Sequence, residues 1–290
     1  MPDNVVISSN ALQREEVPVG LALGGGAARG FAHILIVEAF DELGIRPQII
    51  AGTSMGSIIG AGYAGGLSGK EIREFCVDLF DRRTQVLKRI FAKWPGSLSG
   101  MMNLRTPALV TPEPLIDILL PDELPRTFEE LDIPFEVVTT DFTTQEQYVI
   151  TSGPLIPAIS ASSALPALMK PVELDGRILI DGGFVNPTPY DVIMDRVPFT
   201  IAVDVTGVPA KPEKKPVPGS LDTIVGSTLI MLRSILREKL KNRRPDLLIE
   251  PDVGTYRAMQ FFRCAEILEA AEPAKLELKR ALEDYLKKAA

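Results

Sequence analysis

Short apolar runs alternate along the chain with longer segments of helical character. The run Val17 to Leu23 predicts a buried strand, and Gln48 to Ala51 predicts a second one. Each run is followed by a predicted helix, over about residues 30–43 and 55–66, and Gly44 closes the first helix as a C-cap residue. A strand–loop–helix unit repeated in this way is typical of a parallel sheet covered on both faces. We therefore expect an α/β fold of three layers with a mostly parallel central sheet.

The later parts of the chain continue this pattern. Further helices are expected at about 69–81, 154–165, 223–243 and 257–288, and further strands at 135–140, 148–150, 178–180, 200–205 and 247–250. Two stretches interrupt the pattern with prolines and glycines. We interpret residues 82–112 as a lid or cap insertion, and residues 208–219 as an exposed linker to a C-terminal helical part. Residues 1–16 are expected to form a flexible N-terminus, and 17–290 a single domain.

Composition and charge exclude several classes of protein. The 290 residues are 46% hydrophobic and 24% charged, as in a globular protein with a large core. The net charge of −7 argues against a general nucleic-acid binder. Cys76 and Cys264 are too few and too isolated for a disulfide framework or a zinc site. No apolar run reaches the roughly 18 residues that span a bilayer, and the N-terminus lacks the pattern of a secretory signal. We expect a cytoplasmic protein, with peripheral membrane association left open.

The second predicted strand runs directly into Gly52-Thr53-Ser54-Met55-Gly56. This is the G-x-S-x-G pattern of a nucleophile elbow, in which Gly52 and Gly56 prevent side-chain collisions around the serine. A nucleophilic serine needs a base, usually histidine, and the chain contains one histidine, His33. His33 lies in a segment that we expect to be structural, packed or hydrogen-bonded near a helix end, although a role as the base stays open. The sequence therefore favours a carboxylate as the base.

The first strand ends in the glycine-rich loop Gly24-Gly25-Gly26-Ala27-Ala28-Arg29-Gly30. A nucleotide-binding fingerprint would need a third glycine at Arg29, so a nucleotide-binding module is disfavoured. The backbone N–H groups of Gly25, Gly26 and Ala27 suit an oxyanion hole, with Gly24, Arg29 and Gly30 supporting the loop. A loop that is glycine-rich only for close helix–strand packing is the alternative.

The candidate base follows the predicted strand 178–180. Asp181-Gly182-Gly183 places an aspartate at the end of a strand, where it would face a cleft at the carboxyl edge of an open α/β sheet. We expect partial burial to raise the pKa of this carboxyl. An Asp-Gly-Gly turn without a catalytic role is the alternative.

These three motifs, in this order, resemble the patatin-like phospholipase family, particularly its bacterial members. The segments Ala161-Ser162-Ser163-Ala164-Leu165-Pro166 and Asp181 to Pro187 are similar to family segments as well. The resemblance implies a Ser54–Asp181 dyad without a catalytic histidine, in a lipid acyl hydrolase of the phospholipase A or lysophospholipase type. It implies no metal and no organic cofactor. Ala27 stands where the family has glycine, which keeps open a lipid-binding or regulatory protein with weak or no catalysis.

The expected partners are a lipid or acyl-ester substrate and no nucleic acid, and a homo-oligomer is possible. Residues 82–105 carry six cations and no acid beside Trp94 and several aliphatic side chains. This mixture suits peripheral contact with an anionic membrane, and a solvated cap over the active site is the alternative. The helix that begins near Thr223 has an apolar stripe that we expect to pack on the core, with dimerisation or membrane contact as the alternative.

Overall fold

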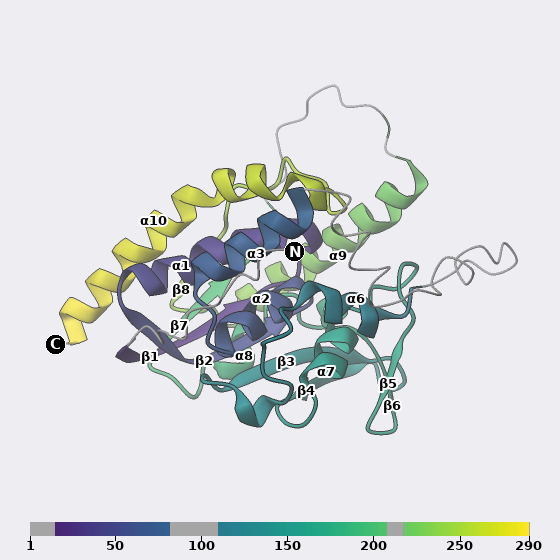
Figure 1. The fold of residues 1–290 in the computed structure, drawn as a ribbon, viewed down its shortest axis with the longest axis horizontal. Helices are drawn as coiled ribbons and strands as arrows, with labels where there is room; N and C mark the ends of the chain where they lie inside the picture. Colours follow the sequence, from purple (N-terminus) through teal and green to yellow (C-terminus); the bar gives the residue numbers. More distant parts are fainter. Residues whose placement is uncertain (1–14, 82–109, 208–216, 218, 290) are drawn as a thin grey trace, which may run out of the picture.

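An eight-stranded sheet forms the centre of the protein in the computed structural model, which describes residues 15–81, 110–207, 217 and 219–289 (Figure 1). The strands follow the order β5-β6-β3-β2-β1-β7-β8, and β4 pairs with β3 outside this path. Their bounds are β1 Glu15–Leu23, β2 Ile45–Thr53, β3 Phe135–Asp141, β4 Glu146–Ile150, β5 Val172–Leu174, β6 Arg177–Asp181, β7 Phe199–Val203 and β8 Leu247–Ile249.

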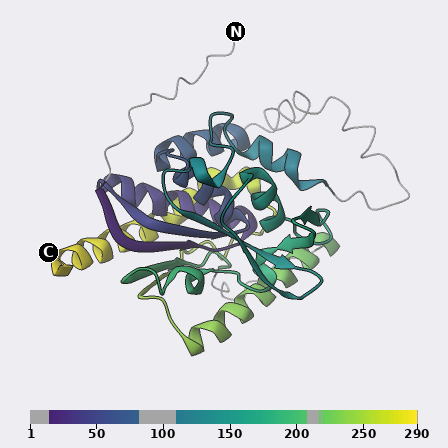
Figure 2. The same cartoon turned by 90° about the horizontal axis from the view of Figure 1, so that it is seen from below.

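Helices cover both faces of this sheet. The α-helices are α1 His33–Glu42, α2 Met55–Ala64, α3 Gly69–Asp81, α6 Pro112–Leu119, α7 Leu155–Ser162, α8 Tyr190–Ile193, α9 Ser220–Asn242 and α10 Cys264–Ala289. Short 3-10 turns lie at η1 Ala27–Ala32, η2 Phe128–Glu130, η3 Gly182–Phe184 and η4 Phe261–Arg263. Helices α1, α3 and α10 pack together on one side, whereas α9 lies on the opposite side (Figure 2). The expected α/β fold with a mostly parallel central sheet is confirmed.

The alternation of side chains along β1 explains the layers. Val19, Leu21 and Leu23 are fully buried in the large core that contains α1, α2 and α10. Ala22, which points to the other face, belongs to a separate cluster with Tyr190 of α8. Because successive residues of a strand point to opposite faces, an apolar residue at every position means that both faces are covered.

The sheet combines parallel and antiparallel pairs. Strands β3, β2, β1, β7 and β8 run parallel to one another, whereas β4 and β6 both run antiparallel to β3. We expected Asp181, at the end of its strand, to face a cleft at the carboxyl edge of the sheet, but β6 does not run parallel to its neighbour β3. Instead, β6 returns along β3, which pairs Asp181 with Thr139, while Thr53 of β2 pairs with Val138. The two motifs therefore meet at the same level of the sheet, separated by one strand.

Several expected segments fall outside the described residues, namely 1–14, 82–109, 208–216 and 218. Within the neighbouring described residues, Glu15 and Glu16 form the beginning of β1 and pair with β2, although we placed them in the flexible N-terminus. Pro112 begins α6, although we placed it in the lid. No helix in the described part of the chain combines the length and the apolar character needed to cross a bilayer.

Candidate active site

Ser54 occupies a sharp turn between β2 and α2. Its backbone has φ 53° and ψ −122°, a combination that a residue with a side chain rarely adopts. The neighbouring glycines make this turn possible, because a Cβ at Gly52 would lie 2.7 Å from Cα of Ser57 and a Cβ at Gly56 would overlap the Leu23 carbonyl. The turn therefore has the geometry of a nucleophile elbow, with the serine side chain held at the beginning of a helix.

The Ser54 hydroxyl donates a hydrogen bond to Oδ2 of Asp181 at 2.8 Å. The second carboxylate oxygen of Asp181, Oδ1, accepts from the backbone N–H of Gly183 at 2.8 Å. Gly182 is required for close approach, because a Cβ there would overlap the Val138 carbonyl. The structure thus brings together the hydroxyl and the carboxylate that the sequence singled out, although 127 residues separate them.

Burial raises the pKa of Asp181 to about 6, against the opposing effect of the hydrogen bonds from Gly183 and Ser54. Only 4% of the residue is exposed. The carboxylate is therefore ionised at neutral pH and is a stronger base than an ordinary aspartate, whose pKa is about 3.9.

Ser162 of α7 holds the backbone of the elbow. Its hydroxyl accepts a hydrogen bond from the N–H of Ser54 at 2.9 Å and donates one to the Val138 carbonyl at 2.7 Å. The hydroxyl therefore links α7, the elbow and β3. This role of Ser162 was not predicted, because nothing in its own segment shows that its hydroxyl contacts the elbow and β3.

The glycine-rich loop presents fewer free N–H groups than expected. The Gly25 N–H already donates to the Pro187 carbonyl at 2.8 Å, so our expectation that it belongs to the oxyanion hole is wrong. The N–H groups of Gly26 and Ala27 make no hydrogen bond within the described part of the chain. The N–H group of Met55, the first residue of α2, likewise makes no hydrogen bond within the described residues. Sequence reasoning missed Met55, although the residue after the nucleophile commonly supplies such an N–H in elbow hydrolases.

Ala27 adopts a positive φ of 50° despite its methyl group. A left-handed conformation costs a residue with a side chain about 1–2 kcal/mol. The methyl packs against a cluster of buried residues on α9 that includes Leu229 and Leu232. At the preceding position, a Cβ on Gly26 would lie 2.7 Å from the Val205 carbonyl oxygen. The loop therefore keeps its close approach at Gly26 and tolerates an alanine at the next residue.

Arg29 and Gly30, the last two residues of the loop, hold it in place. The Arg29 side chain donates to the backbone carbonyls of Thr206, Gly254 and Tyr256. A Cβ at Gly30 would overlap the Met55 side chain, while the Gly24 N–H donates to the Val203 carbonyl at 3.0 Å. These contacts fix the loop against β7, α2 and the segment before η4.

His33 is completely buried beneath the same loop. Its Nε2 lies 2.7 Å from the Gly24 carbonyl oxygen and donates a hydrogen to it, since a carbonyl only accepts. Burial lowers the pKa of His33 to about 4, so the ring is neutral at physiological pH. The structure places this histidine as a support of the loop, with its Nε2 hydrogen already used.

A cavity of about 280 Å³ opens beside Ser54 and Asp181. Its wall is apolar apart from a few hydroxyls and the dyad, and it comes from α2, α6, α9, η4 and the segment after α7. Aliphatic contributors include Ile58, Leu115, Ile116, Leu119, Leu165, Leu168, Val225, Leu229 and Leu232. Such a wall accommodates a hydrocarbon chain next to the Ser54 hydroxyl. In the described residues, no group of three or more His, Cys, Asp or Glu side chains is arranged to hold a metal ion.

The mostly parallel α/β sheet and the strand–serine–helix turn define an α/β protein with the nucleophile elbow of a hydrolase-type site. More specifically, the chain belongs to the patatin-like phospholipase family, whose family model matches residues 21–194.

Relatives from distant organisms support this assignment. The chain is 34% identical over 204 residues to an uncharacterized NTE family protein of Mycobacterium tuberculosis, over 68% of this chain and 51% of the relative. It is 30% identical over 206 residues to the human patatin-like phospholipase domain-containing protein 6, over 64% of this chain and 13% of the relative. The chain thus spans about half the length of the mycobacterial protein and much less of the human one.

Two solved structures are similar to this one at low sequence identity. VipD from Legionella pneumophila has a TM-score of 0.48 at 15% identity, covering 93% of this chain and 67% of that one. ExoU of Pseudomonas aeruginosa, solved with SpcU, has a TM-score of 0.42 at 14% identity, covering 94% and 52%.

Proposed function

We propose that the protein is a serine acyl-ester hydrolase that acts on lipids, of the phospholipase A or lysophospholipase type, through a Ser54–Asp181 dyad. The observation that carries the proposal is the 2.8 Å hydrogen bond between Ser54 Oγ and Asp181 Oδ2 at the wall of an apolar cavity. Membership of the patatin-like phospholipase family supports it.

In the first half of the proposed reaction, Ser54 Oγ attacks the carbonyl carbon of the ester and its proton passes to Asp181 Oδ2. The negative charge that develops on the carbonyl oxygen is stabilised by the N-terminus of α2 and by the N–H groups of Gly26, Ala27 and Met55, which have no partner among the described residues. The tetrahedral intermediate then collapses, the bond to the alcohol oxygen breaks, and Asp181 returns the proton to the departing alcohol.

In the second half, Asp181 accepts a proton from a water molecule that attacks the acylated Ser54. Collapse of this second intermediate releases the fatty acid, and the proton returns to the Ser54 oxygen. The pKa of about 6 suits both halves, because the carboxyl accepts and returns a proton near neutral pH. This scheme uses no metal and no organic cofactor.

The alternative function, a lipid-binding or regulatory protein without efficient catalysis, was considered because Ala27 stands where the family has glycine. The conformation of the glycine-rich loop does not favour this alternative. Ala27 adopts the positive φ that glycine would otherwise provide, and its methyl group packs toward α9. The hydrolase is therefore the function that we carry forward.

The test is hydrolysis of phospholipids, lysophospholipids and short-chain esters by the wild-type protein and Ser54→Ala. We expect turnover by the wild type and a loss of about 10³-fold or more in Ser54→Ala, because the covalent step is removed. Ser160→Ala is a matched control, since Ser160 is a buried serine of α7 whose hydroxyl has no hydrogen-bond partner in the described residues. Equal turnover by wild type and Ser54→Ala would refute the proposal.

A further inference from the structure

One short segment of the chain contacts both members of the proposed dyad. Ser162, the last residue of α7, accepts a hydrogen bond from the Ser54 N–H at 2.9 Å. Further along the same segment, the Ala164 carbonyl accepts a hydrogen bond from the backbone N–H of Asp181 at 3.1 Å. The backbones of Ser54, in the turn after β2, and of Asp181, at the end of β6, are therefore attached to the same stretch of chain, residues 162–164.

The backbone conformation of Ser54 needs support from its surroundings. Its φ of 53° and ψ of −122° are rarely adopted by a residue with a side chain, and such a conformation persists only where neighbouring contacts enforce it. The Ser54 carbonyl accepts hydrogen bonds from the N–H groups of Ser57 and Ile58 and from the Ser57 hydroxyl. The Ser54 N–H donates to the Ser162 hydroxyl. Ser162 is therefore the partner that fixes the turn on its N-terminal side.

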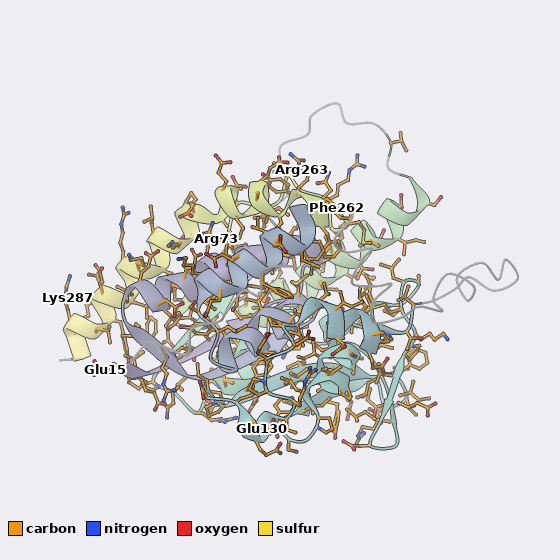
Figure 3. The ribbon with its side chains drawn as sticks, in the orientation of Figure 1. Glu15, Arg73, Glu130, Phe262, Arg263 and Lys287 are labelled. Carbon is orange, nitrogen blue, oxygen red and sulfur yellow. The ribbon has the colours of Figure 1, made fainter. Side chains whose placement is uncertain are left out.

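The Ser162 hydroxyl is shielded from water and uses both of its hydrogen-bonding functions. The residue has no exposed surface, and its hydroxyl donates to the Val138 carbonyl at 2.7 Å. Exposed charged side chains such as Glu130, Arg263 and Lys287 lie around the outline of the molecule (Figure 3). A hydrogen bond in the interior is stronger than one in water, and removal of one buried partner leaves the other group unsatisfied. Loss of this hydroxyl should therefore disturb the turn at Ser54.

We propose that Ser162 is a positioning residue for hydrolysis, whose hydroxyl holds the Ser54 backbone so that Ser54 Oγ stays within hydrogen-bond distance of Asp181. The proposal rests on the proposed function, because it assigns a further residue to that reaction. Ser162 lies outside the wall of the cavity beside the dyad, so it acts through Ser54 and not through contact with substrate. Without its hydroxyl, the turn relaxes and the hydrogen bond between Ser54 and Asp181 lengthens.

Steady-state hydrolysis of a water-soluble short-chain ester by wild type and Ser162→Ala tests this role. We expect kcat to fall by about 10- to 100-fold while KM changes by less than about twofold, because the nucleophile is misplaced and the cavity wall is intact. Ser162→Thr keeps a hydroxyl at this position and should recover most of the lost activity. Ser160→Ala is the matched control on the same helix, since Ser160 is fully buried and its hydroxyl has no partner in the described residues, and it should keep the wild-type kcat.

The pH profile of kcat/KM separates positioning from a general loss of stability. The hydrogen bond from the Ser54 hydroxyl lowers the pKa of Asp181, against the larger effect of burial. If Ser162→Ala lengthens that bond, the carboxylate loses stabilisation and its pKa rises. The midpoint of the acid limb should therefore move upward from about pH 6, by about half a unit. Ser160→Ala should leave this midpoint in place.

Two results would overturn the proposal. One is a folded Ser162→Ala protein with the wild-type kcat. The other is a lower kcat with an unchanged acid limb, which would give Ser162 a role in stability alone. If Ser162→Ala does not fold, Ser162→Cys takes its place, because a thiol donates and accepts only weakly, and the same two results count against the proposal. Failure of the proposed function is separately visible, because the wild-type protein would then leave the ester intact.

Discussion

At the scale of single residues, the Asp181 carboxylate experiences two opposing influences. Burial destabilises its charge, while the Gly183 N–H and the Ser54 hydroxyl stabilise it, and burial is the larger effect. The result is a carboxyl with a pKa of about 6, held 2.8 Å from the hydroxyl whose proton it is proposed to accept. In the proposed mechanism, this environment supplies the basicity that a histidine provides in many serine hydrolases, while His33 supports the glycine-rich loop.

The first prediction concerns the pH dependence of hydrolysis. Because only ionised Asp181 accepts a proton, kcat/KM for a water-soluble ester should rise about tenfold per pH unit below the pKa and level off above about pH 6. Initial rates between pH 4 and 9 measure this profile. A limb with its midpoint near pH 4, the ordinary value for aspartate, would contradict it.

The second prediction links the same carboxyl to stability. Since its pKa is raised on folding, the folded state holds the proton more tightly than the unfolded chain does, and the ionised carboxyl opposes folding. At about 1.4 kcal/mol for each pKa unit, this cost is on the order of 2–3 kcal/mol above pH 6, shrinks as the pH falls, and is absent below about pH 4. Asp181→Asn should therefore raise the free energy of unfolding at pH 8 by this amount while it abolishes turnover.

Chemical denaturation of wild type and Asp181→Asn at pH 8 and pH 4.5 tests the second prediction. The variant should be the more stable protein at pH 8, and the difference should fall to about 1 kcal/mol at pH 4.5. A variant that is less stable at pH 8 would show that the buried carboxylate contributes more through its hydrogen bonds than it costs through burial.

At the scale of elements, three segments meet beside β3: the elbow after β2, the glycine-containing turn after β6, and the glycine-rich loop after β1. The elbow and the glycine-rich loop were predictable from sequence, because each depends on residues that are adjacent in the chain. The acceptor of the Gly25 N–H was not predictable, since Pro187 lies far away in sequence and only the fold brings it there. The direction of β6 also depends on its distant partner β3. Helices α6 and α8 and strand β5 were not predicted, and α8 and β5, of four and three residues, show no period of their own.

The third prediction concerns the glycine-rich loop and Ala27. Replacing Ala27 by glycine should change kcat by less than about threefold, because the backbone already has a positive φ and the methyl packs on α9. Stability should also change by less than about 1 kcal/mol, since relief of strain is offset by the greater freedom of glycine in the unfolded chain. Steady-state kinetics on a water-soluble ester measure the first effect. A tenfold rise in kcat would mean that the methyl obstructs the oxyanion hole.

At the scale of the whole molecule, α1, α3 and α10 are joined by a network of charges on the side away from α9. Glu38 of α1 is buried, and its carboxylate accepts from Arg73 of α3 at 2.5 and 2.7 Å and from Lys275 of α10 at 3.0 Å. Burial raises the pKa of the Glu38 carboxyl, but the hydrogen bonds and positive charges of Arg73 and Lys275 lower it by more. The pKa of Glu38 therefore lies below its usual value. The network ties the C-terminal helix, which lies beyond the segment matched by the family model, to the core of the fold.

The fourth prediction follows from this network. Glu38→Ala should lower the free energy of unfolding by about 2–3 kcal/mol. This is less than the cost of removing one partner of a fully buried ion pair, because Arg73 is partly exposed and solvent screens its charge. Hydrolysis of a water-soluble ester at 25 °C should be unaffected, since Glu38 lies outside the cavity wall. Lys70→Ala is the control, because Lys70 pairs with Glu74 at the surface and its loss should cost less than about 0.5 kcal/mol. Equal effects of the two substitutions on denaturant unfolding would contradict this account.

The central claim is that Asp181 activates Ser54 without help from a histidine, and covalent labelling tests it most directly. A fluorophosphonate reacts only with an activated serine, and intact-protein and peptide mass spectrometry follow the rate and the site of the adduct. We expect a single adduct on Ser54 in the wild type, labelling at least about 10²-fold slower in Asp181→Asn, and retained labelling in His33→Gln. Rapid labelling of Ser54 in Asp181→Asn, or its loss only in His33→Gln, would contradict the claim.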